Sequence, residues 1–259
     1  MSQPLAHIHS KAIIAKNVTI EPFTVIYDDV IIGEGTWIGP NVTIMNGARI
    51  GKNCKIFPGA VISAIPQDLK FEGEFSTAEI GDNTTIRECV TINRGTKITG
   101  KTLVGSNCLL MAYVHIAHDC LVGNGCILAN SVQIGGHVSL DDFCVIGGNV
   151  GIHQFSKIGK YAMVGSGVFV TKDVPPYTKA ARTPVCFTGI NSIGLRRNNF
   201  DDKEINKIKE IYRIIYANGL NNNEAIEYIK TNIEVSAERD EILNFINNSD
   251  RGIMKGNQS

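Results

Sequence analysis

Aliphatic residues recur at every sixth position of this chain from Ile8 to Val170. Only Asp68 and Glu74 interrupt the series. A helix repeats its faces about every 3.6 residues and a strand every two, so neither explains a strict period of six. A hexapeptide repeat that carries the chain along one side of a triangular coil does explain it. Three such units make a coil of eighteen residues, and residues eighteen apart are therefore expected to stack.

A second repeated position supports this winding, because a small or β-branched residue follows each aliphatic residue by four. Glycine often comes directly after the aliphatic residue, as at Gly33 and Gly51, where we expect a backbone angle that a Cβ would resist. Five cysteines occupy the small position, where a thiol acts as a compact apolar filler: Cys54, Cys108, Cys120, Cys126 and Cys144. No CxxC pair is present, so the cysteines do not indicate zinc or disulfides.

Composition narrows the classes of partner. The formal net charge of the 259 residues is zero, so the chain offers no general attraction for nucleic acid or anionic membranes. No run of about 18 apolar residues is present, which predicts a protein that is not embedded in a membrane. The start MSQPLAHIHS lacks the basic and apolar regions of a secretory signal. We expect a cytoplasmic protein.

The repeat is interrupted in two places and ends before the last quarter of the chain. Residues 63–78 gain charge and contain Pro66 and Gly73, which predicts a loop projecting from a corner, and a smaller excursion is expected near 97–102. Helical periodicity begins near Asp201, which forms a capping-box pattern with Glu204. Further helices are expected at 222–231 and 236–247 to cover the open last coil. We divide the chain into an all-β coil, 1–190, and a helical domain, 191–259.

Stacking by eighteen brings three histidines to one corner. One column holds His118, Gly136 and Gln154, and the next holds Asp119 and His137. Ala117, Gly135 and His153 form the column before, and His115 lies on the approach to the same corner. A histidine is the usual base for a hydroxyl nucleophile near neutral pH, and a glycine one coil away can present an unobstructed N–H to an oxyanion. This arrangement favours acyl transfer to an alcohol.

Several motifs are more specific than the repeat. HIAHDCLVGNGCILAN at 115–130, IPQDLK at 65–70, TINRGT at 91–96, IGGHV, IHQF and DVPPY closely resemble the UDP-N-acetylglucosamine O-acyltransferases of lipid A biosynthesis. The resemblance implies a left-handed parallel β-helix, a homotrimer and active sites in the clefts between neighbouring prisms. It also implies transfer of a 3-hydroxyacyl group from acyl carrier protein to the 3-hydroxyl of UDP-N-acetylglucosamine. No metal or diffusible cofactor is implied, because the phosphopantetheine arrives on the carrier.

The resemblance also assigns roles to residues. His118 would be the base, Asp119 would orient or polarise its imidazole, and Gly136 would supply the oxyanion N–H. Ser166 would occupy the position that limits acyl length. The residues implied in substrate binding are Gln67, Asp68, Lys70, His115, His137, His153, Gln154, Asn191, Arg196 and Arg197. Two residues depart from the family pattern: Asn198 stands where many members carry a basic residue, and Ile193 stands where some carry an acid.

Three other readings stay open at this point. Another hexapeptide acyltransferase would keep the coil and a histidine base but should lack IPQDLK and the helical tail. Clustered histidines can also hold zinc, as in a hydrase built on the same scaffold, although a full ligand set is not evident. A non-enzymatic solenoid that binds through a flat face would need a regular outward ladder of one residue type. The outward positions are instead mixed, as at Glu21, Asn41 and Lys52.

Overall fold

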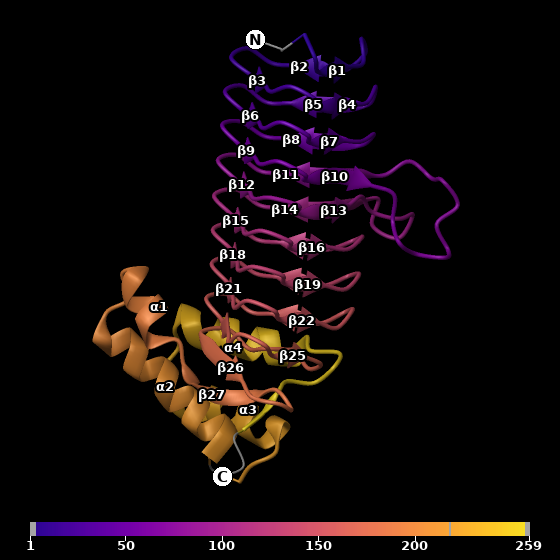
Figure 1. The fold of residues 1–259 in the computed structure, drawn as a ribbon. Helices are drawn as coiled ribbons and strands as arrows, with labels where there is room; N and C mark the ends of the chain where they lie inside the picture. Colours follow the sequence, from indigo (N-terminus) through magenta and orange to yellow (C-terminus); the bar gives the residue numbers. More distant parts are fainter. Residues whose placement is uncertain (1–3, 218, 257–259) are drawn as a thin grey trace.

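The computed structural model describes residues 4–217 and 219–256. The chain winds into a left-handed parallel β-helix, in which short strands on successive coils stack into three sheets that form the sides of a prism (Figure 1). A loop projects from one corner, and helices gather at the carboxyl-terminal end (Figure 1). The coil expected from the hexapeptide period and the left-handed β-helix implied by the family resemblance are therefore both confirmed.

Each sheet takes one strand from every coil, so strands three apart in the chain are neighbours. The nine-stranded sheet contains β1 (His7–Ile8), β4 (Val25–Ile26), β7 (Thr43–Ile44), β10 (Val61–Ala64), β13 (Thr91–Asn93), β16 (His115–Ile116), β19 (Gln133–Ile134), β22 (Gly151–Ile152) and β25 (Phe169–Val170). The eight-stranded sheet contains β2 (Ile13–Ile14), β5 (Val30–Ile32), β8 (Ala48–Ile50), β11 (Thr77–Ile80), β14 (Lys101–Val104), β17 (Leu121–Val122), β20 (Ser139–Leu140) and β23 (Lys157–Ile158). The eleven-stranded sheet contains β3 (Thr19–Ile20), β6 (Trp37–Ile38), β9 (Lys55–Ile56), β12 (Thr85–Ile86), β15 (Leu109–Leu110), β18 (Ile127–Leu128), β21 (Val145–Ile146), β24 (Met163–Val164), β26 (Thr178–Ala181), β27 (Cys186–Ile190) and β28 (Lys255–Gly256).

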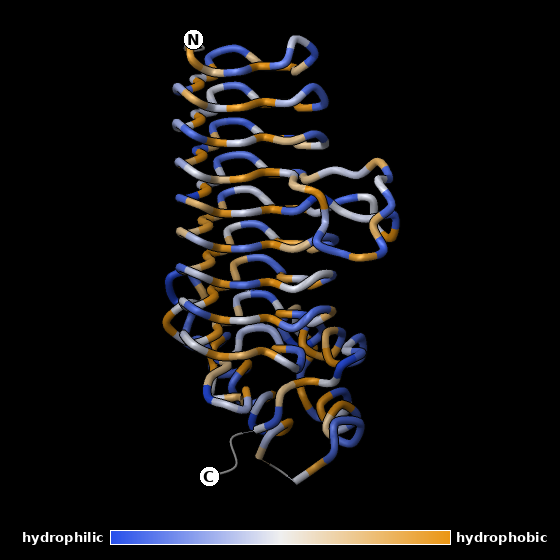
Figure 2. Tube along the Cα trace, turned by 45° about the vertical axis from the view of Figure 1, so that its right-hand side comes forward, coloured by the Kyte–Doolittle hydropathy of each residue, from blue (hydrophilic) through white to orange (hydrophobic). Residues whose placement is uncertain are grey.

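The core follows the two repeated positions. Ile116 and Cys120, which represent the aliphatic and the small position, are both fully buried. Hydrophobic positions consequently recur at the same place on successive rungs (Figure 2). The buried thiols donate weakly to backbone carbonyls of the following coil, as Cys108 Sγ does to Gly123 O at 3.1 Å. The interpretation of these cysteines as packing residues is confirmed.

The reason we expected for the glycine after the aliphatic residue is wrong. Gly33 and Gly51 do not adopt the left-handed backbone conformation, which falls instead on corner residues such as Asn53, with φ of 53°. A Cβ on Gly33 would lie 2.5 Å from the carbonyl carbon of Gly51, so the neighbouring coil leaves no room for it. These glycines allow close stacking of backbones, whereas asparagines frequently take the positive φ.

Both expected excursions are present, and both preserve the frame. Val61 pairs with Thr91, thirty residues on rather than eighteen, so twelve extra residues enter the projecting loop (residues 65–76). Thr77 pairs with Lys101, twenty-four residues on, so six extra residues enter a second loop (residues 94–100). Insertions in multiples of six return the chain to the same register. Ile98, which falls on an aliphatic position of the repeat, is an exposed loop residue.

The helical region contains α1 (Ser192–Arg197), α2 (Asp202–Ala217), α3 (Asn222–Asn232) and α4 (Ala237–Asn247). The capping box before α2 is confirmed: Asp201 N donates to Glu204 Oε2 at 2.6 Å, and Glu204 N donates to Asp201 Oδ1 at 2.8 Å. The division at residue 190 stays a prediction, because β28 returns from the helical tail to pair with β27. Across residues 4–217 and 219–256, every helix is too short or too polar to cross a bilayer.

Candidate active site

A groove of about 390 Å³ runs along the nine-stranded sheet beside the corner where the histidines stack. We call this the site corner; it comprises residues 117–119, 135–137 and 153–155. Register confirms the stacking, because His115 pairs with Gln133 and Gln133 with Gly151. The groove is lined by Gln67, His115, Ala117, His118, Gln133, Ile134, Gly135, Gly136, Gly151, Ile152, Gln154 and Phe169. Five of the candidate site residues therefore share one groove.

His118 and Gly136 approach one another closely. A Cβ added to Gly136 would lie 2.7 Å from His118 Cε1 and 2.8 Å from His118 Nε2. The imidazole therefore occupies the space that any other residue at position 136 would fill. Within residues 4–217 and 219–256, the Gly136 N–H donates to no protein acceptor. An imidazole and an unused backbone donor thus meet in one groove, one strand spacing apart.

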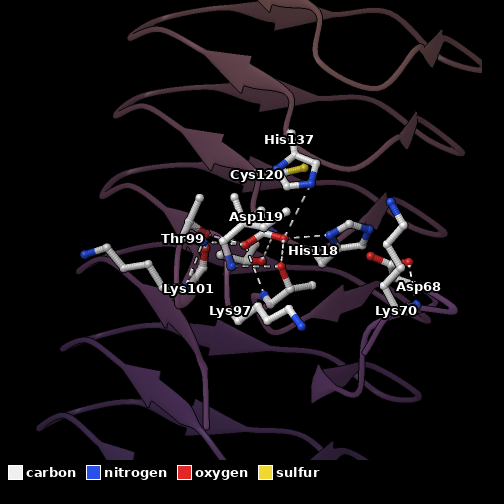
Figure 3. A network of polar contacts seen from close by, with 12 residues as sticks. Asp68, Lys70, Lys97, Thr99, Lys101, His118, Asp119, Cys120 and His137 are labelled. Carbon is white, nitrogen blue, oxygen red and sulfur yellow. Dashed lines mark hydrogen bonds and ion pairs between the residues drawn. The ribbon is translucent and has the colours of Figure 1, made fainter. Parts of the chain in front are cut away.

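Asp119 lies behind the imidazole with a fully buried side chain, and its Oδ2 is 2.7 Å from His118 Nδ1 (Figure 3). The second loop surrounds this carboxylate: Thr96 donates from N at 3.0 Å and from Oγ1 at 2.8 Å, and the Thr99 hydroxyl also donates to it. Burial opposes ionisation of Asp119, but the hydrogen bonds from Thr99, His118 and Thr96 outweigh it and lower the pKa to about 2.

An ionised Asp119 can only accept a hydrogen bond, so His118 Nδ1 must carry the proton. The other ring nitrogen, Nε2, is then the acceptor, and it is the nitrogen close to Gly136. A carboxylate that fixes the tautomer and orientation of an imidazole is the usual support for a histidine base. The expected pairing of Asp119 with His118 is present, although adjacent side chains commonly diverge.

His137 and His115 flank this pair. The His137 ring stacks on Phe155, with centroids 4.6 Å apart, and meets the His118 ring edge to face at 5.1 Å. Burial lowers the pKa of His137, although the Asp119 charge partly opposes this effect. His115 Nδ1 is 2.7 Å from the Thr91 hydroxyl, and burial followed by the nearby His118 lowers the pKa of His115. Both flanking imidazoles are therefore biased towards the neutral form.

The projecting loop lies beside the groove. Gln67 lines the groove, and the imidazole of His118 points towards the side on which Asp68 and Lys70 lie (Figure 3). The Asp68 carboxylate accepts from the Lys70 N–H at 3.0 Å, a bond within the loop. The Lys97 N–H of the second loop donates to Glu74 Oε1 at 2.9 Å. The projecting loop and the second loop are therefore hydrogen-bonded to one another beside the site corner.

Other candidate residues lie away from this groove in the single chain. Asn191 and Arg197 line a separate groove of about 360 Å³ beside α1. Asn191 caps α1, and its amide donates to Tyr161 O at 2.9 Å. Arg196 pairs with Asp202 at 2.8 Å. Ser166 is exposed and lines neither of these grooves.

His153 stands at the edge of the site corner. Its Nδ1 lies 3.0 Å from the carbonyl oxygen of Gln154, and its side chain does not line the groove. Gln154 itself lines the groove. One chain therefore brings His118, Gly136 and Gln154 into one groove, but Asn191 and Arg197 lie in another.

One triplet has the spacing of metal ligands. Single ligand atoms from His118, Asp119 and His137 all lie within 4.8 Å of one another. His118 Nδ1 and Asp119 Oδ2 are already joined by a hydrogen bond of 2.7 Å. A cation there would have to break this bond and compete with the donors from Thr96 and Thr99. The donor set fits an imidazole and carboxylate pair better than a metal.

Reasoning from the sequence missed several residues around the site corner. Thr96 and Thr99 form the pocket for Asp119; the only signal for them was the second excursion, whose contacts the period cannot give. Phe169 lines the groove at its carboxyl-terminal end, where its ring would lie 2.8 Å from a Cβ on Gly151. Arg251 reaches the corner from the helical tail, 97 residues from Gln154 in the chain.

Two family models match the chain. Residues 173–254 match a model described as UDP-N-acetylglucosamine O-acyltransferase, domain 2. Residues 29–64 and 101–136 match the bacterial transferase hexapeptide model. The first match includes the helical tail and names an O-acyltransferase, whereas the second lies within the coil and names a bacterial transferase repeat.

Curated relatives and solved structures agree. A protein of Chlorobaculum parvum named acyl-[acyl-carrier-protein]--UDP-N-acetylglucosamine O-acyltransferase is 51% identical over 93% of this chain and 92% of its own. A Sulfurihydrogenibium protein of the same name is 51% identical over 96% of this chain and 93% of its own. The crystal structure of a UDP-N-acetylglucosamine acyltransferase from Bacteroides fragilis superposes with a TM-score of 0.97 at 51% identity, covering 98% of this chain and 100% of that one.

Proposed function

The chain belongs to the family of UDP-N-acetylglucosamine O-acyltransferases, and on that premise we propose that it transfers a 3-hydroxyacyl group from acyl carrier protein to the 3-hydroxyl of UDP-N-acetylglucosamine, with His118 as general base. Membership of this family makes the chain an acyltransferase of lipid A biosynthesis. The observation that carries the mechanism is the contact of the His118 imidazole with the bare backbone of Gly136 in one groove.

The proposed transfer uses only groups of this chain and of its two substrates. His118 Nε2 takes the proton of the sugar hydroxyl as its oxygen attacks the thioester carbon. The Gly136 N–H, which has no acceptor among the described residues, donates to the resulting oxyanion. Collapse of the tetrahedral intermediate expels the phosphopantetheine thiolate, which takes the proton back from the imidazolium. Asp119 stays ionised throughout, because its pKa is about 2, and holds the imidazole in place.

The flanking residues fit roles in substrate binding. Gln67 reaches the groove from the projecting loop, and Asp68 is on the side that His118 faces, where its carboxylate can accept from sugar hydroxyls. Lys70 lies beside Asp68, and the His137 ring meets the His118 ring edge to face (Figure 3). We place the sugar at this end of the groove and the carrier arm towards Gln154.

We further propose that the functional unit is a homotrimer. Asn191 and Arg197 line a groove apart from that of His118 in one chain, so a role for them in substrate binding would require a neighbouring chain. The prism sides also expose large apolar residues that a neighbour could cover: Ile13, Ile31, Leu121, Ile127 and Met163. A cytoplasmic location is the expectation for this activity.

The test is an acyl-transfer assay with UDP-N-acetylglucosamine and a panel of 3-hydroxyacyl carrier proteins of different chain length. Wild type should transfer at least one length, and His118→Ala should lose kcat by roughly two to four orders of magnitude with little change in sugar-nucleotide binding. His7→Ala, which replaces a histidine of the first coil, is the matched control and should behave as wild type. Wild type treated with a chelator should stay active.

The outcomes separate the competing functions. If no length is transferred, the proposed reaction is refuted. If transfer persists in His118→Ala, the reaction stands but the base is misassigned. If acyl transfer is lost on chelation and restored by zinc, the triplet of His118, Asp119 and His137 is a metal centre, and a metal-dependent transfer replaces the general-base mechanism.

A further inference from the structure

The backbone at the site corner forms a ladder in which each carbonyl is bound by the next coil. His137 N donates to His118 O at 3.1 Å, and Phe155 N donates to Gly136 O at 3.1 Å. In both bonds the donor is nineteen residues beyond the acceptor. The same rule assigns the third carbonyl, Gln154 O, to the N–H of Asp173.

That third rung is missing, because the last coil is shorter. Ile158 pairs with Val174, sixteen residues on rather than eighteen, so the chain cuts the corner by two residues. The Asp173 N–H consequently turns to Gly252 O in the helical tail, at 3.1 Å. Gln154 O, on a residue that lines the groove, therefore has no backbone donor among the described residues, and its nearer side-chain neighbour is His153, whose Nδ1 lies 3.0 Å away.

The tail supplies a second side chain to this carbonyl, from Arg251. Arg251 Nη1 donates to Gln154 O at 3.4 Å, and Nε and Nη2 donate to Thr171 O at 3.3 and 3.2 Å. One planar guanidinium therefore spans two carbonyls that belong to successive coils. Lys172 Nζ holds the backbone of Arg251 itself, with 2.6 Å to Arg251 O.

A second set of contacts holds the other end of the same corner. The buried carboxylate of Asp173 accepts from Lys157 N at 2.8 Å and from Ser249 Oγ at 2.6 Å. Lys157 Nζ in turn donates to Asn248 O at 2.6 Å and pairs with Asp250 at 2.8 Å. The tail segment 248–252 thus contacts the chain on both sides of Phe155, at Gln154 and at Lys157.

Movement of this corner would reach the reacting groups directly. Phe155 N bonds to the carbonyl oxygen of Gly136, and the Phe155 ring stacks on His137, which meets His118 edge to face. We infer that Arg251 is a positioning residue for the active site: it takes the place of a further coil and fixes the Gln154 and Phe155 backbone beneath Gly136. The kinetic part of this inference rests on the proposed acyl transfer, and the structural part does not.

The test compares Arg251→Ala and Arg251→Lys with Arg239→Ala. Arg239 is a matched control, because among the described residues its guanidinium bonds only to Ile233 O and Asp240, both within the tail. Hydrogen exchange of the amides at 154–157 should rise about tenfold in Arg251→Ala and stay unchanged in Arg239→Ala. kcat/KM for the acyl carrier protein should fall about tenfold in Arg251→Ala, and Arg251→Lys should recover part of the loss.

The exchange measurement tests whether Arg251 holds the corner, and the kinetic measurement tests whether it positions the site. Unchanged exchange in Arg251→Ala, or an equal rise in Arg239→Ala, overturns the grip on the corner. Faster exchange with wild-type kcat/KM shows that the tail holds the corner but does not position the site, and this also overturns the inference. If wild type shows no transfer, the proposed function fails, while the exchange measurement still decides whether Arg251 holds this backbone.

Discussion

The sharpest test of the site geometry is the substitution Gly136→Ala. The added Cβ would lie 2.7 Å from His118 Cε1 and 2.8 Å from Nε2, whereas ordinary contacts begin at 3.4 Å. The imidazole must therefore move by about 0.7 Å or more, and this displacement strains its 2.7 Å bond to Asp119. The peptide N–H of residue 136 is retained, so the substitution displaces the base and leaves the oxyanion donor in place.

A misplacement of about 1 Å in a catalytic group can cost a factor of about 100. We therefore expect kcat for acyl transfer to fall about 100-fold, equivalent to about 2.7 kcal/mol of barrier, with a smaller change in KM. Gly136 is not in the left-handed region, so alanine introduces no backbone strain there. Thermal unfolding should accordingly change little compared with the change in kcat.

Gly148→Ala is the matched control. It lies in the same coil as Gly136, and its added Cβ would meet only Asn130 O, at 3.4 Å. Steady-state rates with UDP-N-acetylglucosamine and an acyl carrier protein substrate should stay close to wild type in this variant. The double variant with His118→Ala should be hardly slower than His118→Ala alone, because no ring remains to be displaced. The reasoning is refuted if Gly136→Ala is folded and keeps kcat within about threefold of wild type. It is also refuted if the loss of kcat in the double variant equals the combined losses of the two single variants.

Two further predictions concern acid stability and assembly. The pKa of Asp119 is about 2 in the folded chain and about 3.9 when unfolded, so its carboxylate stabilises the fold above about pH 4 and this contribution disappears as the pH falls towards 2. Urea unfolding between pH 5 and 2.5 should show a shallower loss of stability in Asp119→Asn than in wild type, and parallel curves would contradict the assignment. Light scattering of the purified protein should give three times the chain mass, and a fully active monomer would exclude the proposed trimer.

The period of six in the sequence determines the coil. Because side chains at Ile116 and Cys120 can only be buried if the chain turns every six residues, the repeat specifies the sheets, their register and the stacking of residues eighteen apart. The same arithmetic brought His118 and Gly136 together and placed the thiols inside. The helices also followed from local signals, such as the capping box of Asp201 and Glu204, although the short α1 was missed.

Tertiary structure decided what the period cannot encode. The insertions carry no repeat, so only their folded path shows that Thr96 and Thr99 enclose Asp119 or that Gln67 reaches the groove. The orientation of one side chain towards its chain neighbour, as between Asp119 and His118, depends on the positive φ of Asp119, 60°, and on those threonines.

Contacts between segments far apart in the chain could not be predicted from the sequence either. Arg251 meets Gln154 only because the last coil is two residues short and the tail folds back across it. A repeat fixes neighbours at a constant separation along the chain, whereas loops and tails find theirs through packing and hydrogen bonds that depend on the whole fold. The sequence therefore determined the scaffold and the meeting of His118 with Gly136, and the tertiary structure determined how that pair is held.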